Sequence, residues 1–208
     1  MSNSSSLGAL RKRFFSLFGI FPLTIYVVFH LCNNLSSLQG PEAFNAIYDK
    51  SRASPIIIPI MILLIWIPIM FHGIYGLSLA WKSRYSPSQF PYFENLKYIL
   101  QRLSGIGLLL FIPAHLLKAK ILPTLDGHPA DFAHMAEAFS EPLTLIVYIL
   151  GVLGVAYHIG NGLWQFSIGW GLTVTEAAMK KMQVVSILVF LAISAMGYAA
   201  IGGFLMSH

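Results

Sequence analysis

The chain has 208 residues, of which 56% are hydrophobic and only 10% are charged, and its formal net charge is +5. Soluble domains carry roughly 25% charged residues, so this composition excludes a soluble enzyme and also a disordered chain. The 13 Lys and Arg residues form no basic tract, which argues against a nucleic-acid partner, and a single cysteine excludes a disulfide framework. We therefore expect an all-α integral membrane protein.

Five apolar runs are long enough to cross a bilayer, whose core of about 30 Å requires roughly 20 helical residues. None of the five contains an acidic residue. They predict transmembrane helices at residues 14–35, 56–81, 98–122, 143–166 and 184–206. We expect the whole chain, 1–208, to form a single transmembrane domain.

The first apolar run directly follows a basic triplet, as a signal peptide would. It is longer than the apolar part of a signal peptide and lacks a small-residue cleavage pattern, so we interpret it as a retained span. Prolines lie inside three of the spans, where membrane helices tolerate them. Kinks are expected at Pro22, Pro59, Pro68 and Pro113.

Lysine and arginine are distributed unequally between the two sides of the predicted bundle. One side receives nine of them: Arg11, Lys12, Arg13, Lys82, Arg84, Lys97, Arg102, Lys180 and Lys181. The other side receives four: Lys50, Arg52, Lys118 and Lys120. The positive-inside rule then predicts a multi-pass protein of the cell (inner) membrane with a cytoplasmic N-terminus and an external C-terminus. The connection at 123–141 is long and acidic enough to form a surface helix or loop.

Each of the first four spans contains one histidine: His30, His72, His115 and His158. A single intramembrane histidine is as readily a polar staple between helices as a functional residue. These four, however, lie at a common offset of about 24 Å from the start of their spans. Because consecutive spans run in opposite directions, His30 and His115 should lie in the outer third of the bilayer, and His72 and His158 in the inner third. The two layers should be on the order of 15 Å apart.

Each layer thus presents two imidazoles from two helices, which is what one low-spin haem iron needs as axial ligands. The pattern predicts two b-type haems. Zinc or di-iron sites would require carboxylates or thiols, which the spans almost lack. Glycines beside the histidines, at 73, 76, 105 and 107, would let a flat ring approach, although small residues also serve ordinary helix packing.

Haem propionates require water or hydrogen-bond donors near the membrane surface. By depth alone, Lys97 and Arg102 are candidates at the inner end of the third span, and Lys118 and Lys120 at its outer end. Terminal basic residues usually extend to the interface or set the topology. Arg102 is favoured because it lies inside an otherwise apolar stretch, and Ser16 lies at a similar inner depth.

The motifs around these histidines carry a resemblance that spans nearly the whole chain. They are GPEAFN at 40–45, HGIYG at 72–76, LQRLSG at 100–105, HIGNGLWQF at 158–166 and WGLT at 170–173. In this order and spacing, the chain resembles the five-helix, di-haem cytochrome b subunits of succinate:menaquinone oxidoreductases and related fumarate reductases.

The resemblance implies an inner haem ligated by His72 and His158 and an outer haem ligated by His30 and His115. It also implies partners: a flavoprotein that oxidises succinate and an iron-sulfur subunit, which would pass electrons through the haems to menaquinone. Some relatives carry a glutamate where this chain has Ala156, so proton transfer through such a carboxylate is not implied here.

Polar residues after the first span are candidates for the quinone site, namely Glu42, Asn45 and Asp49. An ordinary solvated loop is an equally good interpretation of them. Two further alternatives stay open for the chain as a whole. It could be the di-haem cytochrome b anchor of another membrane dehydrogenase: a complex that works in the fumarate reductase direction, a hydrogenase or a formate dehydrogenase. It could also be a non-redox anchor whose histidines staple helices together.

Overall fold

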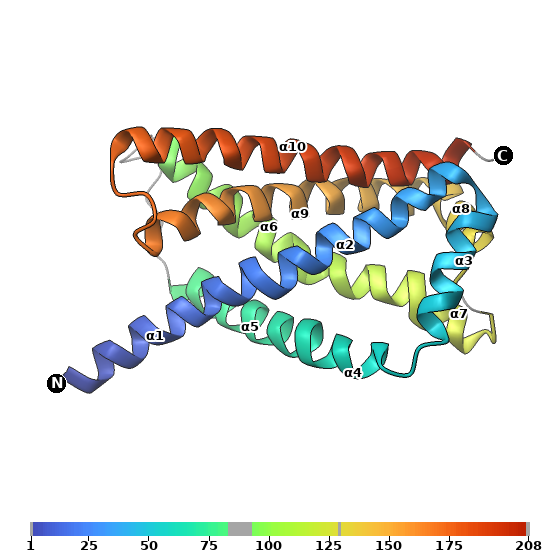
Figure 1. Ribbon diagram of the computed structural model, residues 1–208, viewed down its shortest axis with the longest axis horizontal. Helices are drawn as coiled ribbons and strands as arrows, with labels where there is room; N and C mark the ends of the chain where they lie inside the picture. The colour runs from blue at the N-terminus through green and yellow to red at the C-terminus, as the bar shows by residue number, and fades with distance from the viewer. Residues whose placement is uncertain (1, 83–92, 129, 207–208) are drawn as a thin grey trace.

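The computed structural model describes residues 2–82, 93–128 and 130–206, and the expected inner charge at Arg84 lies outside these residues. Within them the chain is helical and contains no strand. The two chain ends lie at opposite ends of an elongated bundle (Figure 1). We call these ends the N-terminal end and the α3/α8 end, since α3 and α8 lie together beside the C-terminus.

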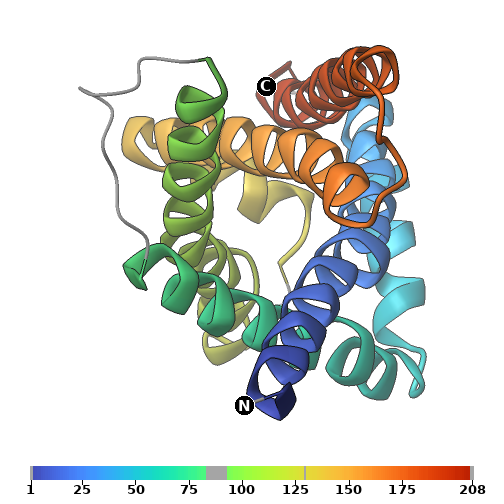
Figure 2. The same cartoon turned by 90° about the vertical axis from the view of Figure 1, so that its left-hand side faces the viewer.

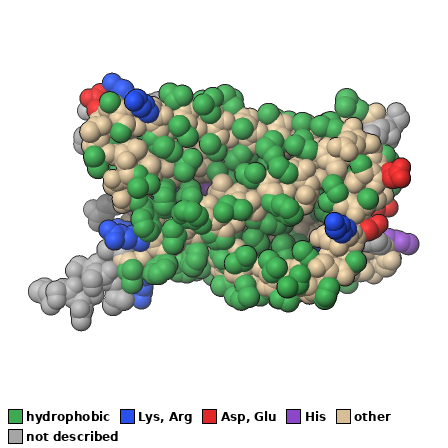
Figure 3. Space-filling model, viewed as in Figure 1, with side chains coloured by type: hydrophobic (Ala, Val, Ile, Leu, Met, Phe, Trp, Pro, Cys, Tyr) green, Lys and Arg blue, Asp and Glu red, His purple; other side chains and the backbone are tan. Residues whose placement is uncertain are grey.

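Five helical stretches are long and apolar enough to cross a membrane, which confirms the expected architecture. They cover Leu10–Gln39, Ile57–Lys82, Asn95–Leu125, Pro142–Gly169 and Glu176–Met206. Four of the five exceed the predicted span, because hydropathy detects only the lipid-facing part of a helix that continues into polar residues. The second stretch has the same length as its predicted span and is shifted by one residue. On the face shown in Figure 3, apolar side chains cover the middle of the molecule and charged ones gather at its ends, as a bilayer requires.

The first three stretches are each divided into segments by a short turn of π-helix. The first contains α1 (Ser2–Phe18), η1 (Gly19–Thr24) and α2 (Ile25–Asn34); the second contains α4 (Ile57–Met61), η3 (Ile62–Trp66) and α5 (Ile67–Lys82); the third contains α6 (Phe93–Leu116), η4 (Leu117–Ile121) and α7 (Leu122–Leu125). The fourth and fifth, α9 (Pro142–Gly169) and α10 (Glu176–Met206), are unbroken α-helices.

Prolines explain the position of these π-helical turns. A proline has no N–H, so the carbonyl four residues earlier loses its α-helical partner. Pro68 and Pro123 leave carbonyls unpaired within η3 and η4, and Pro22 lies inside η1. The wider turn accommodates the mismatch within the helix. Pro113, by contrast, lies within α6.

Three shorter elements complete the α3/α8 end: η2 (Leu35–Gln39), α3 (Pro41–Arg52) and α8 (Phe132–Ser140). Gly40 adopts φ 99°, which suits glycine, and Pro41 then begins α3 with its φ already helical. The solvated-loop interpretation of 42–49 was therefore wrong about secondary structure. Helix α8 fulfils the expectation of a surface helix or loop between the third and fourth spans, and the Asp131 side chain caps it by accepting from the His134 N–H at 2.9 Å.

Buried aromatic residues close the bundle at this end. Phe44 of α3 packs edge-on against Phe204 of α10, with ring centroids 5.0 Å apart, and Phe132 and Phe139 of α8 pack against the same Phe204 ring. Tyr148 of α9 joins this cluster. The cluster thus attaches the two surface helices to the ends of the fourth and fifth spans.

Viewed along its length, the bundle has four spans around a central region and the fifth outside them (Figure 2). Helix α10 packs along α9 through small residues. The Ser186 hydroxyl donates to the Gly160 carbonyl at 2.7 Å, and a Cβ on Gly160 would lie 2.8 Å from the Ser186 carbonyl oxygen. A Cβ on Gly197 would similarly lie 2.6 Å from Val152. The α9–α10 contact therefore requires backbones at close approach.

Candidate metal centres

One histidine pair lies toward the N-terminal end, where His72 of α5 faces His158 of α9. Their ring centroids are 6.1 Å apart and the ring planes are inclined by 85°. The Nδ1 of His72 lies 3.0 Å from the carbonyl oxygen of Phe15, which can only accept, so this nitrogen carries the proton. The Nε2 atom of His72 is then left with the lone pair that a metal requires.

Both imidazoles of this pair rest on glycines. A Cβ on Gly19 would lie 2.7 Å from His72 Cε1, and one on Gly105 would lie 3.1 Å from His158 Cε1. The Phe15 ring stacks on His72 with centroids 4.3 Å apart. The expectation that glycines let a haem ring approach stays a prediction, since Gly105 lies here against the imidazole of His158.

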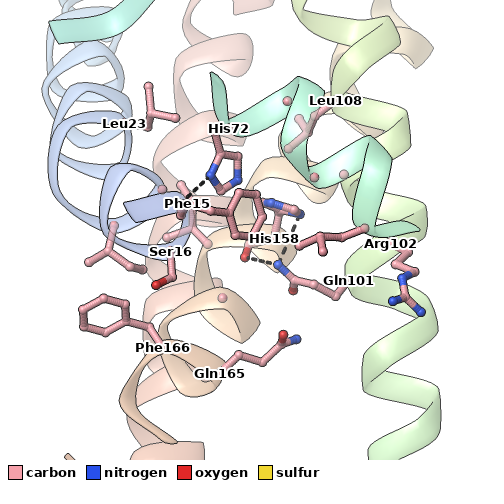
Figure 4. A pocket seen from close by; sticks show the side chains of 18 of the residues that line it. Phe15, Ser16, Leu23, His72, Gln101, Arg102, Leu108, His158, Gln165 and Phe166 are labelled. Carbon is pink, nitrogen blue, oxygen red and sulfur yellow. Dashed lines mark hydrogen bonds between the residues drawn. The ribbon is translucent and has the colours of Figure 1, made fainter. Parts of the chain in front are cut away.

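A cavity of about 620 Å³ opens beside this pair, between α1, η1, α5, α6 and α9. Both histidines and Arg102 line it (Figure 4). Lys12 and Arg13 line it as well. Its volume is within the range of cofactor pockets, roughly 300 to 1,000 Å³. The cavity thus combines two metal-ligand side chains with a cationic rim.

The second pair lies toward the α3/α8 end, where His30 of α2 faces His115 of α6. The ring centroids are 5.8 Å apart and the planes are inclined by 81°. The Nδ1 of His115 lies 3.2 Å from the Tyr148 hydroxyl, whereas His30 Nε2 lies 3.3 Å from the Asn34 amide nitrogen. In His30 the Nε2 atom, rather than Nδ1, therefore has the polar neighbour.

A tyrosine on α3 borders this second pair through Asn34. Burial, together with the nearby Tyr26, raises the pKa of Tyr48 to about 12, although a hydrogen bond with Asn34 and the charge of Arg52 act in the opposite direction. Tyr48 therefore stays a neutral phenol at physiological pH.

The two pairs lie at clearly different levels along the bundle. Tyr148, which contacts His115, and His158 are ten residues apart on the unbroken α9, a rise of about 15 Å. This separation is the one that the offsets in the sequence predict. The structure thus brings together His72 with His158 and His30 with His115, in two layers.

The geometry of each pair fits a six-coordinate haem iron. Imidazole nitrogens bind metals at roughly 2 Å, and the ring centre lies about 1 Å further, so two axial histidines place their centroids about 6 Å apart. The observed 6.1 and 5.8 Å agree with this value. Neutral imidazoles from facing helices are also the donor set that low-spin haem requires.

The residues expected near haem propionates are found at different places. Ser16 lines the cavity and accepts from the indole N–H of Trp170 at 2.9 Å. Arg102 also lines the cavity, but its guanidinium lies 3.5 Å from the centroid of the Tyr98 ring, and Figure 4 shows it directed away from the histidines. Lys97 instead donates to Gln183 and lies over the Trp164 ring, toward α10.

Lys118 lies at the other end of the third span. Its ammonium pairs with Glu141 at 3.1 Å. Hydrogen bonds from Thr144 and Lys118, with the charge of Lys118, hold the pKa of Glu141 below its ordinary value.

The expected quinone residues all lie on α3. Glu42 is exposed in the first turn of this helix. The Asn45 side chain accepts from the Phe132 N–H at 2.9 Å and so links α3 to α8, and Asp49 forms an ion pair with Arg52 at 2.9 Å. None of the three lines the 620 Å³ cavity or a second, apolar one of about 310 Å³ between η1, α9 and α10.

Sequence reasoning missed the residues that hold the imidazoles in place. Phe15, Gly19, Ser104 and Tyr148 contact the histidines from neighbouring helices. Their residue types are common in membrane helices, so the sequence carries no signal for them beyond the polarity of Ser104 beside Gln101.

Five helices long enough to cross a membrane, with two facing histidine pairs, define a membrane protein that can hold haem between its helices. A family model described as the succinate dehydrogenase/fumarate reductase transmembrane subunit matches residues 85–196. The succinate dehydrogenase cytochrome b558 subunit of Bacillus subtilis (strain 168) is 34% identical over 193 residues, which cover 93% of this chain and 95% of that protein. The chain therefore belongs to the family of succinate dehydrogenase/fumarate reductase transmembrane subunits, and it is a multi-pass transmembrane protein.

Proposed function

We propose that this chain is the membrane-anchor cytochrome b subunit of a succinate dehydrogenase, and that it carries electrons to menaquinone through two b haems. The observation that carries the proposal is the pairing of four histidines at 6.1 and 5.8 Å in two layers. The name of the Bacillus subtilis relative supports both the complex and the cytochrome.

In this proposal His72 and His158 hold the inner haem, and His30 and His115 hold the outer one. When bound, the two haems supply one-electron carriers at two depths of the membrane. The Phe15 carbonyl fixes His72 as an Nδ1–H donor, so that its Nε2 keeps the lone pair that a metal requires. For His30 to bind through Nε2, the amide of Asn34 must give up its contact with that atom.

Charged and polar groups then bind the propionates. At the rim of the inner cavity Arg102 and Ser16 are assigned this role, and Lys12 and Arg13 add positive charge there. At the other end Lys118 is assigned to the outer haem, and it is held close to the helix ends by Glu141.

The overall reaction is shared with partner subunits. Oxidation of one succinate to fumarate on the flavoprotein releases two electrons and two protons, and the iron-sulfur subunit delivers the electrons to this chain. One menaquinone takes up two electrons and two protons and becomes the quinol. We assign the quinone site to α3, where Glu42 is an exposed carboxylate available for proton exchange. Asn45 and Asp49 lie one and two turns along the helix, and Asp49 is also exposed but pairs with Arg52.

The proposed orientation places the N-terminal end in the cytoplasm and the C-terminus outside the cell membrane. Arg11, Lys12 and Arg13 at one end of the first span and the pair Lys180 and Lys181 at the start of the fifth support it. The iron-sulfur subunit then docks at the end nearest to the His72–His158 pair. The whole chain acts in this arrangement as one transmembrane domain.

A spectrum of the purified complex tests the proposal. We expect the dithionite-reduced minus oxidised spectrum to be that of b-type haem, with two haems per chain, and succinate to reduce at least one of them. Replacement of His72 or His158 by Ala should remove one haem, and replacement of His30 or His115 the other. Haems that are reduced by hydrogen or formate but not by succinate would indicate another dehydrogenase. If protein expressed with an adequate haem supply contains no haem, the chain is a non-redox anchor whose histidines make polar contacts between helices.

A further inference from the structure

The side-chain amides of Asn161 and Gln101 lie next to His158, and backbone carbonyls determine how these amides are oriented. Asn161 donates from Nδ2 to the Gln101 Oε1 at 2.8 Å and to the Lys97 carbonyl at 3.4 Å. Gln101 in turn donates from Nε2 to the His158 carbonyl at 3.1 Å. Reversing either amide would place its oxygen against another oxygen acceptor, so the orientations of both amides are fixed.

The buried Oδ1 of Asn161 provides a further sign of this constraint. Asn161 is 4% exposed, and among the described residues its Oδ1 has no hydrogen-bond partner. The two backbone carbonyls therefore determine how Asn161 is oriented, even though its own oxygen is left unsatisfied.

The fixed amides determine which neighbour of His158 Nδ1 can accept a proton. Two groups lie near this nitrogen: Gln101 Nε2 at 3.3 Å and Ser104 Oγ at 3.1 Å. The amide nitrogen can only donate, so its contact with Nδ1 is a hydrogen bond only while that nitrogen is unprotonated, and it cannot accept a proton from Nδ1. The Ser104 hydroxyl donates its own hydrogen to the Gln101 carbonyl at 3.0 Å and so offers its lone pairs to the histidine. A proton on Nδ1 is therefore received by Ser104.

We propose that Ser104 is a positioning residue for the inner site, which accepts the Nδ1–H of His158 and so keeps the Nε2 atom of that histidine unprotonated and able to bind a metal. This inference rests on the proposed function and adds a residue to it. The two halves of the site differ in an important way. The Nδ1–H of His72 binds the backbone carbonyl of Phe15, which remains when any side chain is replaced. The Nδ1–H of His158 binds the side-chain hydroxyl of Ser104, which replacement by alanine removes.

This difference predicts an electronic effect on one haem only. A hydrogen bond from the distal ring nitrogen makes an imidazole a stronger donor and favours the oxidised metal. Without the hydroxyl, the ligand is a weaker donor, so the midpoint potential of that haem rises. The other haem, in the second layer, contacts neither Ser104 nor His158 and keeps its potential.

The test is a redox titration of both haems in the whole complex, with Ser104→Ala compared with two further variants. Ser104→Thr retains the hydroxyl. Ser78→Ala is the matched control, because Ser78 likewise donates to the carbonyl three residues earlier, that of Tyr75 at 2.7 Å, on a helix of the same bundle. We expect one raised midpoint in Ser104→Ala, a value near the wild type in Ser104→Thr, and no change in Ser78→Ala.

Ser104→Ala with two haems and two unchanged midpoints would overturn the proposal. If Ser104→Ala loses one haem, retention of both haems in Ser104→Thr supports the hydroxyl's role, and an equal loss in Ser104→Thr contradicts it. Wild-type protein without haem would contradict the proposed function itself, which separates the two failures.

Discussion

Replacement of Gly19 by Ala adds one methyl group directly against the inner imidazole. The new Cβ would lie 2.7 Å from His72 Cε1 and 3.1 Å from its Nδ1. The first distance is 0.7 Å short of the 3.4 Å at which ordinary contact begins. The ring must therefore retreat, and its hydrogen bond to the Phe15 carbonyl is displaced with it.

Overpacking of this kind costs about 1 to 3 kcal/mol, which corresponds to roughly 5- to 150-fold weaker retention of a ligand held by the displaced ring. We expect Gly19→Ala to lower the haem-to-protein ratio from two toward one after purification and to reduce the thermal stability. Gly105→Ala, with its closest contact at 3.1 Å, should show a smaller loss.

The matched control is Gly107→Ala on α6, because among the described residues no atom beyond its chain neighbours and its own helix backbone lies within 4 Å of the added Cβ. It should retain both haems at the wild-type ratio. Two haems and wild-type thermal stability in Gly19→Ala would refute the reasoning, since the methyl group would then fit beside His72 without displacing it.

Two further substitutions test the second pair and the helix ends. Tyr148→Phe removes the hydroxyl beside His115 Nδ1 and should cost about 0.5 to 1.5 kcal/mol of stability. It should change the midpoint potential of the outer haem alone, and a change confined to the inner haem would contradict this assignment. Hydrogen bonds from Thr144 and Lys118 lower the pKa of Glu141 from 4.5 in the folded protein, so its stabilising effect is present above that pH and is lost as the pH falls through the folded pKa. The thermal stability of Glu141→Gln should therefore lie slightly below that of the wild type at pH 7 and converge with it in acid, and a constant difference at all pH values would argue against the linkage.

The five spans could be predicted from the sequence because the requirement for about 20 apolar residues is local. Their ends could not. The fifth helix begins at Glu176 rather than at residue 184, since its first two turns are polar and hydropathy does not detect them. Helix α3 was missed for the same reason: its polar residues resemble a loop, and it is held by Phe44, whose partners lie on α8 and α10.

The site divides in a similar way. The depth of a histidine follows from its position in a span, so the two layers could be predicted. The partner of a side chain depends on packing between distant segments. Depth alone suggested Lys97 and Lys118 for propionates, yet Lys97 turns to Gln183 and Lys118 pairs with Glu141. Gly19, 53 residues before His72, could be recognised only once the helices were placed side by side.

The unbroken α9 beside three interrupted spans has a consequence for the distance between the two histidine layers. An α-helix turns about 100° and rises 1.5 Å per residue. Inserting or deleting one residue in α9 would therefore change the distance between the layers by about 1.5 Å and would also rotate His158 away from His72. A π-helical turn has the effect of one inserted residue and re-phases a helix face by that same rotation. Such turns lie between Phe15 and His30, before His72 and after His115. The fourth span thus fixes the spacing of the two histidine layers, and the π-helical turns set how the other three spans are rotated relative to it.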